Sequence, residues 1–363
     1  MIWNESRNSH FMLGTVIVIT VTDQHLSIEI ELERIATTDN NVRSLWAKYI
    51  TMKDYLATQY YPWIQANCPY FTDHGQLHIE STIETASQIL LPSPKNLEKL
   101  HALDFYLLLC AIIWHDAGNV YNRSSHAMQV SQMVQEINKE IFYSPTILRL
   151  VTELVKAHKG EDGLEVPSRE QDCVIGTKTC TVYPRALAAV LRFADEISEN
   201  RSRISPALLT EGKVPKENKI YWEYANCVVG SRADPLRERI VVTVEIEADR
   251  ATEKYPCPEE CMRYSGRDGS ISLIEYAISR LQKMNNERAY CAREFGMYTS
   301  IREIEVRLML THRGERVKEY TNEFVVHDSG LHDYTYPKIE FFGDFFKHHP
   351  HWNPNKIMEW SMK

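Results

Sequence analysis

The stretch LLLCAIIWHDAGNVYNRSSHA, residues 107–127, decides how this sequence is interpreted. Residues 100–115 would be apolar on nearly every side of a helix, which predicts a helix at the centre of a core. This run ends in His115 and Asp116, and a further histidine follows at position 126. The pair either satisfies a helix end, through the helix dipole and backbone hydrogen bonds, or holds a metal ion. Taken alone, the dipeptide favours the helix-end interpretation.

The sequence around this stretch predicts further helices, because apolar residues recur at steps of three and four. Ser144-Pro145 and Thr72-Asp73 are typical helix starts. The predicted helices cover residues 42–66, 73–90, 100–115, 124–142, 144–158 and 183–199, and residues 160–182 are predicted to form a long polar loop.

The two ends of the chain differ from this helical part. Residues 14–32 favour a β-hairpin, with a helix from about residue 26 as the alternative. Beyond residue 205, strands are predicted over 219–229, 238–248 and 301–310, with one amphipathic helix over 270–295. We therefore expect a mainly α core with an additional α+β region: an irregular or β-rich segment over 1–40, a helical domain over 41–205 and an α+β region over 206–363.

Histidines and aspartates occupy helical positions throughout the predicted core. Five separate helices or helix ends carry them, so no local spacing makes a site. If the helices form a bundle and these side chains point inward, they converge as ligands do in carboxylate-histidine metal sites. Imidazole and carboxylate together suit Fe, Mn, Co, Ni or Zn, and an oxygen-rich position also suits Mg. The six residues are His78, His115, Asp116, His126, His158 and Asp195.

This ordered set resembles the HD superfamily of metal-dependent phosphohydrolases. An opening histidine in FTDHGQLHIEST, a His-Asp pair in WHDAGN and a closing aspartate in LRFADEIS carry the resemblance, over roughly residues 60–205. His78 matches the opening ligand better than His74. The resemblance implies that His78, His115, Asp116 and Asp195 hold one ion and that His126 and His158 complete a second site. It extends, more weakly, to HD modules of bacterial conflict and signalling systems.

The resemblance implies hydrolysis of a phosphoester or phosphoanhydride by metal-activated water, with a nucleotide as the expected substrate. Asp116, His126 and His158 are the expected catalytic residues, and one or two divalent ions are the expected cofactor. Arg123, Lys159 and Arg201 are candidates to bind the substrate phosphate, with Arg203 in the same ENRSRIS cluster. Two other functions stay open: a non-catalytic nucleotide-binding module that docks a protein partner through residues 206–363, and a metal-dependent single-strand nuclease.

Composition limits these functions further. The formal net charge is −8, which argues against a broad binding face for duplex nucleic acid but not against a small phosphorylated ligand. The eight cysteines are too dispersed for a disulfide framework. We find neither a membrane span nor a signal peptide in the sequence, and so expect a cytoplasmic protein.

Overall fold

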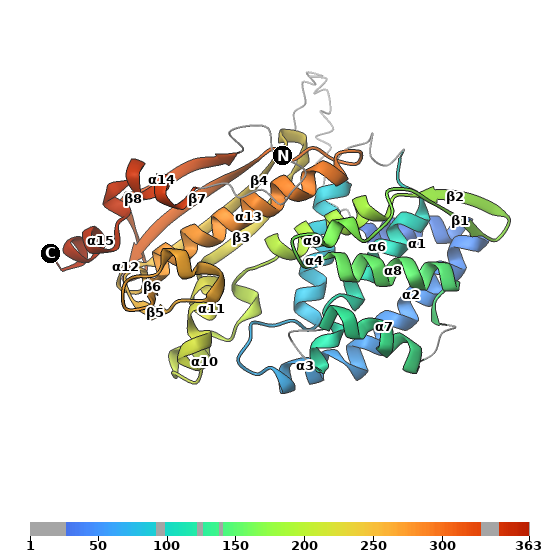
Figure 1. Ribbon diagram of the computed structural model, residues 1–363, viewed down its shortest axis with the longest axis horizontal. Coiled ribbons are helices and arrows are strands. Elements are labelled where there is room, and N and C mark those ends of the chain that lie inside the picture. Colours follow the sequence, from blue (N-terminus) through green and yellow to red (C-terminus); the bar gives the residue numbers. More distant parts are fainter. Residues whose placement is uncertain (1–26, 92–98, 122–125, 138–140, 328–340, 363) are drawn as a thin grey trace, which may run out of the picture.

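The computed structural model describes residues 27–91, 99–121, 126–137, 141–327 and 341–362. The chain is mostly helical, with a mixed sheet in its C-terminal half, as the sequence predicted. Figure 1 shows the helices at one end of the molecule and the sheet at the other, with α13 lying along the sheet. The helices that precede the sheet are α1 (Ile28–Thr38), α2 (Asn40–Gln59), α3 (Tyr61–Asn67), α4 (Gln76–Leu90), α6 (Ala102–Trp114), α7 (His126–Ile137), α8 (Pro145–Ala157), α9 (Pro184–Ile197), α10 (Pro206–Thr210) and α11 (Lys216–Cys227).

Helix α6 is the centre of the helical part. Every residue from Leu103 to Trp114 is buried, and α6 packs against α1, α2, α4, α8 and α9. This apolar run is therefore shielded on all sides, and His115 and Asp116, which follow it, lie in the interior. A short 3-10 turn, η1 (Ala117–Val120), follows directly.

The C-terminal sheet has the order β3-β4-β7-β8, with β3 (Val228–Asp234), β4 (Arg239–Glu247), β7 (Glu303–His312) and β8 (Glu315–His327). Its central pair, β4 and β7, is parallel, and both outer pairs are antiparallel. The connection between the parallel strands contains α12 (Ala248–Ala251), the small pair β5 (Lys254–Pro256) and β6 (Ser270–Ser272), and the long helix α13 (Leu273–Phe295). A capping box between Ser272 and Glu275 begins α13.

Helix α13 joins the two parts of the molecule. It packs against β7 and β8 of the sheet and also against α9 of the helical part. Buried residues of β4 and β7 alternate with more accessible ones, so one face of the sheet is apolar and belongs to the same core as the helices. The two parts therefore share one continuous hydrophobic core.

Two segments form a different kind of secondary structure from the one that the sequence predicted. Residues 219–227 form part of α11 instead of a strand, because Ile220, Tyr224 and Cys227 lie on one buried helical face. Only the last two residues of the predicted strand, 228 and 229, belong to β3. The predicted loop over 160–182 contains a hairpin of β1 (Gln171–Ile175) and β2 (Lys178–Val182), with Gly176 in the turn at φ 59°.

The N-terminal hairpin prediction is also wrong over its second half, where the helical alternative is confirmed. Ser27 caps α1, and Ile28, Leu32 and Ala36 are buried at helical spacing. Residues 14–26 lie outside the described part of the chain. Beyond residue 340 the structure contains α14 (Phe342–His348) and α15 (Pro354–Ser361).

Candidate metal centre

The histidines and aspartates predicted from the sequence converge in the helical part. His78 lies in the first turn of α4, His115 and His158 follow directly on α6 and α8, and His126 begins α7. The side chains of these four histidines and of Asp116 are at most 5% exposed, and only Asp195 on α9 is partly accessible, at 27%. Residues far apart in the sequence thus meet around one small volume.

Two groups of side chains could each hold a cation. His78, His115 and Asp116 form one group, and Asp116, His126 and His158 form the other. The imidazole Nε2 atoms face each other at 3.3 Å in both groups, His78 with His115 and His126 with His158. Two imidazoles that meet through their Nε2 atoms beside a carboxylate are a donor set that suits a divalent transition metal.

Asp116 connects the two groups. Its Oδ2 lies 3.4 Å from His115 Nε2 and 3.6 Å from His78 Nε2, whereas its Oδ1 lies 3.2 Å from His126 Nε2. One carboxylate thus offers an oxygen to each group. A carboxylate in this position could bridge two ions, if each group held one.

Asp195 lies beside the first group and contacts its two histidines. Its Oδ1 lies 3.0 Å from His78 Nε2 and 3.7 Å from His115 Nε2. The residue comes near the end of α9, whose N-terminal and middle turns are buried. Asp195 therefore stands where the buried centre opens to solvent.

Hydrogen bonds on the far side of the rings fix their orientation. His115 Nδ1 contacts the Ile112 carbonyl oxygen at 2.7 Å, and His158 Nδ1 contacts the Val155 carbonyl oxygen. Ser198 Oγ lies 3.4 Å from His78 Nδ1. A ring whose Nδ1–H donates to a carbonyl presents an unprotonated Nε2, which is the atom that binds metals. These contacts direct the Nε2 atoms of His115 and His158 toward the centre, as metal ligation requires.

Local backbone packing sets the position of His126. Gly118, two residues after Asp116, lies so close to α7 that an added Cβ would be 2.1 Å from the carbonyl oxygen of His126. Only glycine leaves room for this approach. The AGN turn after the His-Asp pair therefore lets the start of α7 reach Asp116.

The electrostatics of the centre favour positive charge between the carboxylates. Burial by itself would lower the pKa of His115, but Asp116 and Asp195 raise it to about 10. Burial would raise the pKa of Asp195, yet hydrogen bonds from His115 and His78 hold it well below its ordinary value. Burial, together with the neighbouring His115, lowers the pKa of His158 to about 3, so its imidazole stays neutral.

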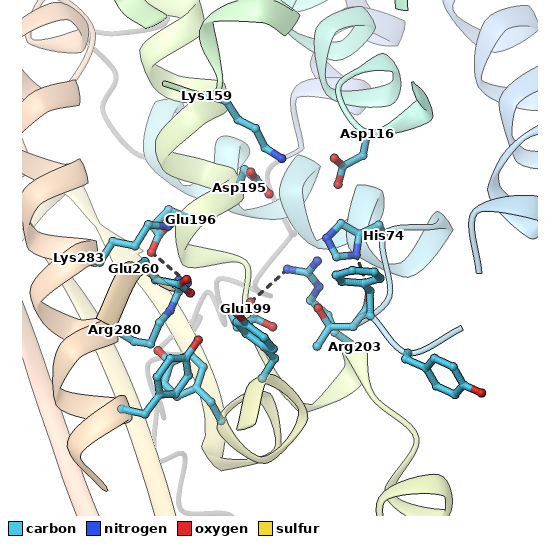
Figure 2. A pocket seen from close by; sticks show the side chains of 16 residues that line it. His74, Asp116, Lys159, Asp195, Glu196, Glu199, Arg203, Glu260, Arg280 and Lys283 are labelled. Carbon is cyan, nitrogen blue, oxygen red and sulfur yellow. Dashed lines mark hydrogen bonds and ion pairs between the residues drawn. The ribbon is translucent and has the colours of Figure 1, made fainter. Parts of the chain in front are cut away.

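A cavity of about 390 Å³ opens beside the centre. Asp116 and Asp195 reach it from the candidate metal centre, and Lys159 and Arg203 also line it (Figure 2). Arg203 is buried and oriented by the Asp73 carbonyl oxygen at 2.8 Å and by Glu199 at 3.4 Å. The cavity is lined by Tyr70, Phe71, Thr72, His74, Asp116, Lys159, Asp195, Glu196, Glu199, Arg203, Tyr221, Tyr224, Glu260, Tyr276, Arg280 and Lys283.

The sequence suggested three basic side chains as candidates to bind the substrate phosphate. Lys159 lines the cavity. Arg201 does not: its side chain is 47% exposed and lies 3.8 Å from Glu245 on β4, so the ENRSRIS cluster contributes Arg203 instead. Arg123 lies outside the described residues.

The sequence did not identify the α11 and α13 residues of the cavity. The YWEYAN stretch that carries Tyr221 and Tyr224 was predicted as a strand, and no motif marks Arg280 or Lys283. A helical reading of residues 216–227 would have placed both tyrosines on one helix, but only the packing of that helix against α13 brings them to the cavity.

A bundle of helices whose inward histidines and aspartates gather around a shared Asp116 defines an HD-type domain. Comparison with protein families agrees: residues 68–256, just over half of the chain, match the HD-CE family of HD domains. The chain belongs to this family. The match extends beyond residue 205 through β3, β4 and α12, so it includes part of the sheet. No curated protein and no solved structure matches the chain significantly. None of the helices that the structure describes is long and apolar enough to span a membrane.

Proposed function

We propose that this protein is a metal-dependent phosphohydrolase that acts on a small phosphorylated molecule, a nucleotide. The observation that carries the proposal is the Asp116 carboxylate, which offers one oxygen to each histidine group at the edge of a cavity. His78, His115, Asp116 and Asp195 would hold one divalent ion, and His126 and His158 with Asp116 would hold a second. Such ions lower the pKa of bound water and polarise a phosphoryl oxygen.

The chain supplies the remaining chemistry of phosphate binding. Lys159 and the buried Arg203 lie on the cavity wall beside Asp116 and Asp195, as Figure 2 shows. Their charges would hold the phosphate oxygens that do not face the ions. The hydrogen bond from Arg203 to the Asp73 carbonyl oxygen fixes the guanidinium before a substrate arrives.

The charge of the cavity explains why a metal would be needed to bind substrate. Five carboxylates and four lysine or arginine side chains line it, so the protein alone presents a slight excess of negative charge to a phosphate. One divalent cation reverses that sign. We therefore expect phosphate affinity to depend on the metal, and the cavity volume of about 390 Å³ suits a small molecule rather than a duplex.

The test compares the wild-type protein with His115→Ala/Asp116→Ala after loading with Mn²⁺, Fe²⁺ or Ni²⁺. Wild type is expected to retain metal by elemental analysis and to release phosphate from at least one nucleotide. The double variant removes ligands from both groups, so metal content and turnover should fall together, turnover by more than about 100-fold. Asp195→Asn serves as a nearly isosteric second variant.

A matched control is Asp344→Ala/His348→Ala, which removes an exposed His and Asp from α14. This control should keep both metal and turnover. A wild-type protein that retains metal and releases no phosphate would contradict the proposal and favour the nucleotide-binding module. Cleavage of single-stranded DNA without nucleotide turnover would favour the nuclease.

A further inference from the structure

The cavity beside the metal centre has a second end, which the C-terminal region builds. Arg280 and Lys283 reach it from α13, and Tyr221 and Tyr224 reach it from α11. In Figure 2 the α13 side chains lie across the cavity from His74 and Asp116, with Glu199 and Arg203 between the two sides. A phosphate group at the metal centre would therefore leave the rest of its molecule facing α11 and α13.

This second end contains buried polar atoms without a hydrogen bond among the described residues. Glu199 Oε1 and Arg280 Nε are both in this state. One further atom of each side chain is hydrogen-bonded: Glu199 Oε2 accepts from Arg203 at 3.4 Å, and an Arg280 terminal nitrogen donates to Glu196 at 3.2 Å. Buried polar groups in native proteins almost always have partners, so an unpaired acceptor and an unpaired donor in the lining of one cavity could both be satisfied by a ligand.

Aromatic side chains form the wall beside these atoms. Tyr221 and Tyr224 each meet Tyr276 edge to face, with ring centroids 6.0 Å and 5.6 Å apart. Tyr224 and Tyr276 are fully buried, whereas Tyr221 is partly accessible and can present ring surface to a ligand. Mutual packing makes the tyrosines a rigid wall, and rigid aromatic walls bind flat rings by stacking.

From these observations we infer that the second end of the cavity is a nucleobase site, formed by Tyr221, Tyr224, Glu199 and Arg280, which selects the substrate by its base. A nucleobase is flat and carries N–H donors beside ring-nitrogen or carbonyl acceptors, which matches the tyrosine wall, the unpaired Glu199 oxygen and the unpaired Arg280 N–H. This inference rests on the proposed function, because it assigns the non-phosphate half of the same substrate. It also gives α11 and α13 a role in substrate specificity.

The test measures binding rather than turnover. Isothermal titration calorimetry of the Mn²⁺-loaded protein compares AMP, GMP, CMP and UMP with inorganic phosphate. For wild type, at least one mononucleotide should bind 30-fold or more tightly than phosphate. In Tyr221→Ala and Glu199→Gln, that ratio should fall at least fivefold, since one loses the stacking surface and the other replaces a carboxylate acceptor by an amide. Tyr121→Ala and Glu259→Gln, both exposed and outside the cavity, should keep the wild-type ratio.

The outcomes separate this inference from the proposed function. Binding of phosphate with no preference for any mononucleotide would overturn the nucleobase site and leave the phosphohydrolase proposal standing. A preference that neither variant reduces would also overturn it. A protein that binds neither Mn²⁺ nor phosphate would overturn both. Should Tyr221→Ala unfold, which circular dichroism would reveal, the Glu199→Gln result decides, because glutamine preserves the volume of the side chain.

Discussion

At the scale of single residues, burial sets the state of Asp104 in the first turn of α6. This carboxylate accepts a hydrogen bond from the His101 backbone N–H at 2.8 Å and so closes a capping box. Burial nevertheless raises the pKa of Asp104 to about 7, against the opposing effect of that hydrogen bond. The helix that carries His115 and Asp116 therefore begins at an acid that prefers to be protonated.

Asp104 is predicted to make stability fall as the pH rises. Its pKa in the folded state lies above the unfolded value of about 3.9, so the folded protein binds an additional proton between about pH 4 and pH 7. This proton therefore stabilises the folded state at the acid end of the window, and the stabilisation is lost as the pH rises through about 7. Asp104→Asn removes the proton linkage. Relative to wild type, the variant should gain more than about 1 kcal/mol in unfolding free energy between pH 4.5 and pH 8.

Urea unfolding of the variant and of wild type at the two pH values measures this gain. Other titrating groups contribute to both proteins alike, so their effects cancel in the comparison. An equal stability difference between variant and wild type at both pH values would show that Asp104 is ionised in the folded protein throughout this range.

At the scale of elements, the contact between α9 and α13 fixes the two halves of the cavity. Arg192 on α9 makes a bidentate ion pair with Glu287 on α13, at 2.6 Å and 2.9 Å, and both side chains are buried. Arg192 also donates to the carbonyl oxygen of Gly160, in the loop that carries His158 and Lys159. One guanidinium thus connects the helix of Asp195, the loop of His158 and the C-terminal region.

Removing the charge of Glu287 is predicted to destabilise the protein strongly. Glu287→Gln leaves a buried Arg192 charge without compensation, which costs about 3–5 kcal/mol. Glu294→Gln, on the same helix, is the matched control. Glu294 pairs only loosely, at 3.9 Å, with the exposed Arg169, and its loss should cost less than about 1 kcal/mol. Denaturant unfolding of both variants provides the comparison, and equal losses would refute the role given to the buried pair.

At the scale of the whole molecule, the helical part and the α+β region share one hydrophobic core. The sequence predicted a boundary at residue 205. Helix α9, which precedes this position, is buried almost throughout and packs against α13 of the C-terminal region. Phe193 of α9 and Phe295 of α13 have ring centroids 6.0 Å apart. Cutting the chain at residue 205 would expose this apolar surface and the charge of Arg192.

A fragment of residues 1–205 is therefore predicted not to fold cooperatively. Gel filtration and thermal unfolding followed by circular dichroism compare it with the full chain. We expect aggregation or a broad transition, because the fragment loses a large shared core. A sharp transition near the melting temperature of the full chain would show instead that residues 1–205 are an independent domain.

The sequence by itself determined which side chains could ligate a metal and that they lie on helices. It did so because apolar periodicity and helix-end signals depend on neighbours a few residues apart, and the order of His78, His115, Asp116 and Asp195 carries the family resemblance. It failed for Tyr221 and Tyr224, since a stretch rich in aromatic residues suits a strand or a buried helix equally until its packing partner is known.

Only the tertiary structure decided that Asp116 faces both histidine groups and that α11 and α13 complete the cavity. These arrangements depend on helix packing over separations of tens to more than a hundred residues, on a close approach that Gly118 permits and on a buried ion pair between α9 and α13. Local sequence patterns specify elements; the shared core positions those elements relative to one another, and that positioning creates the site.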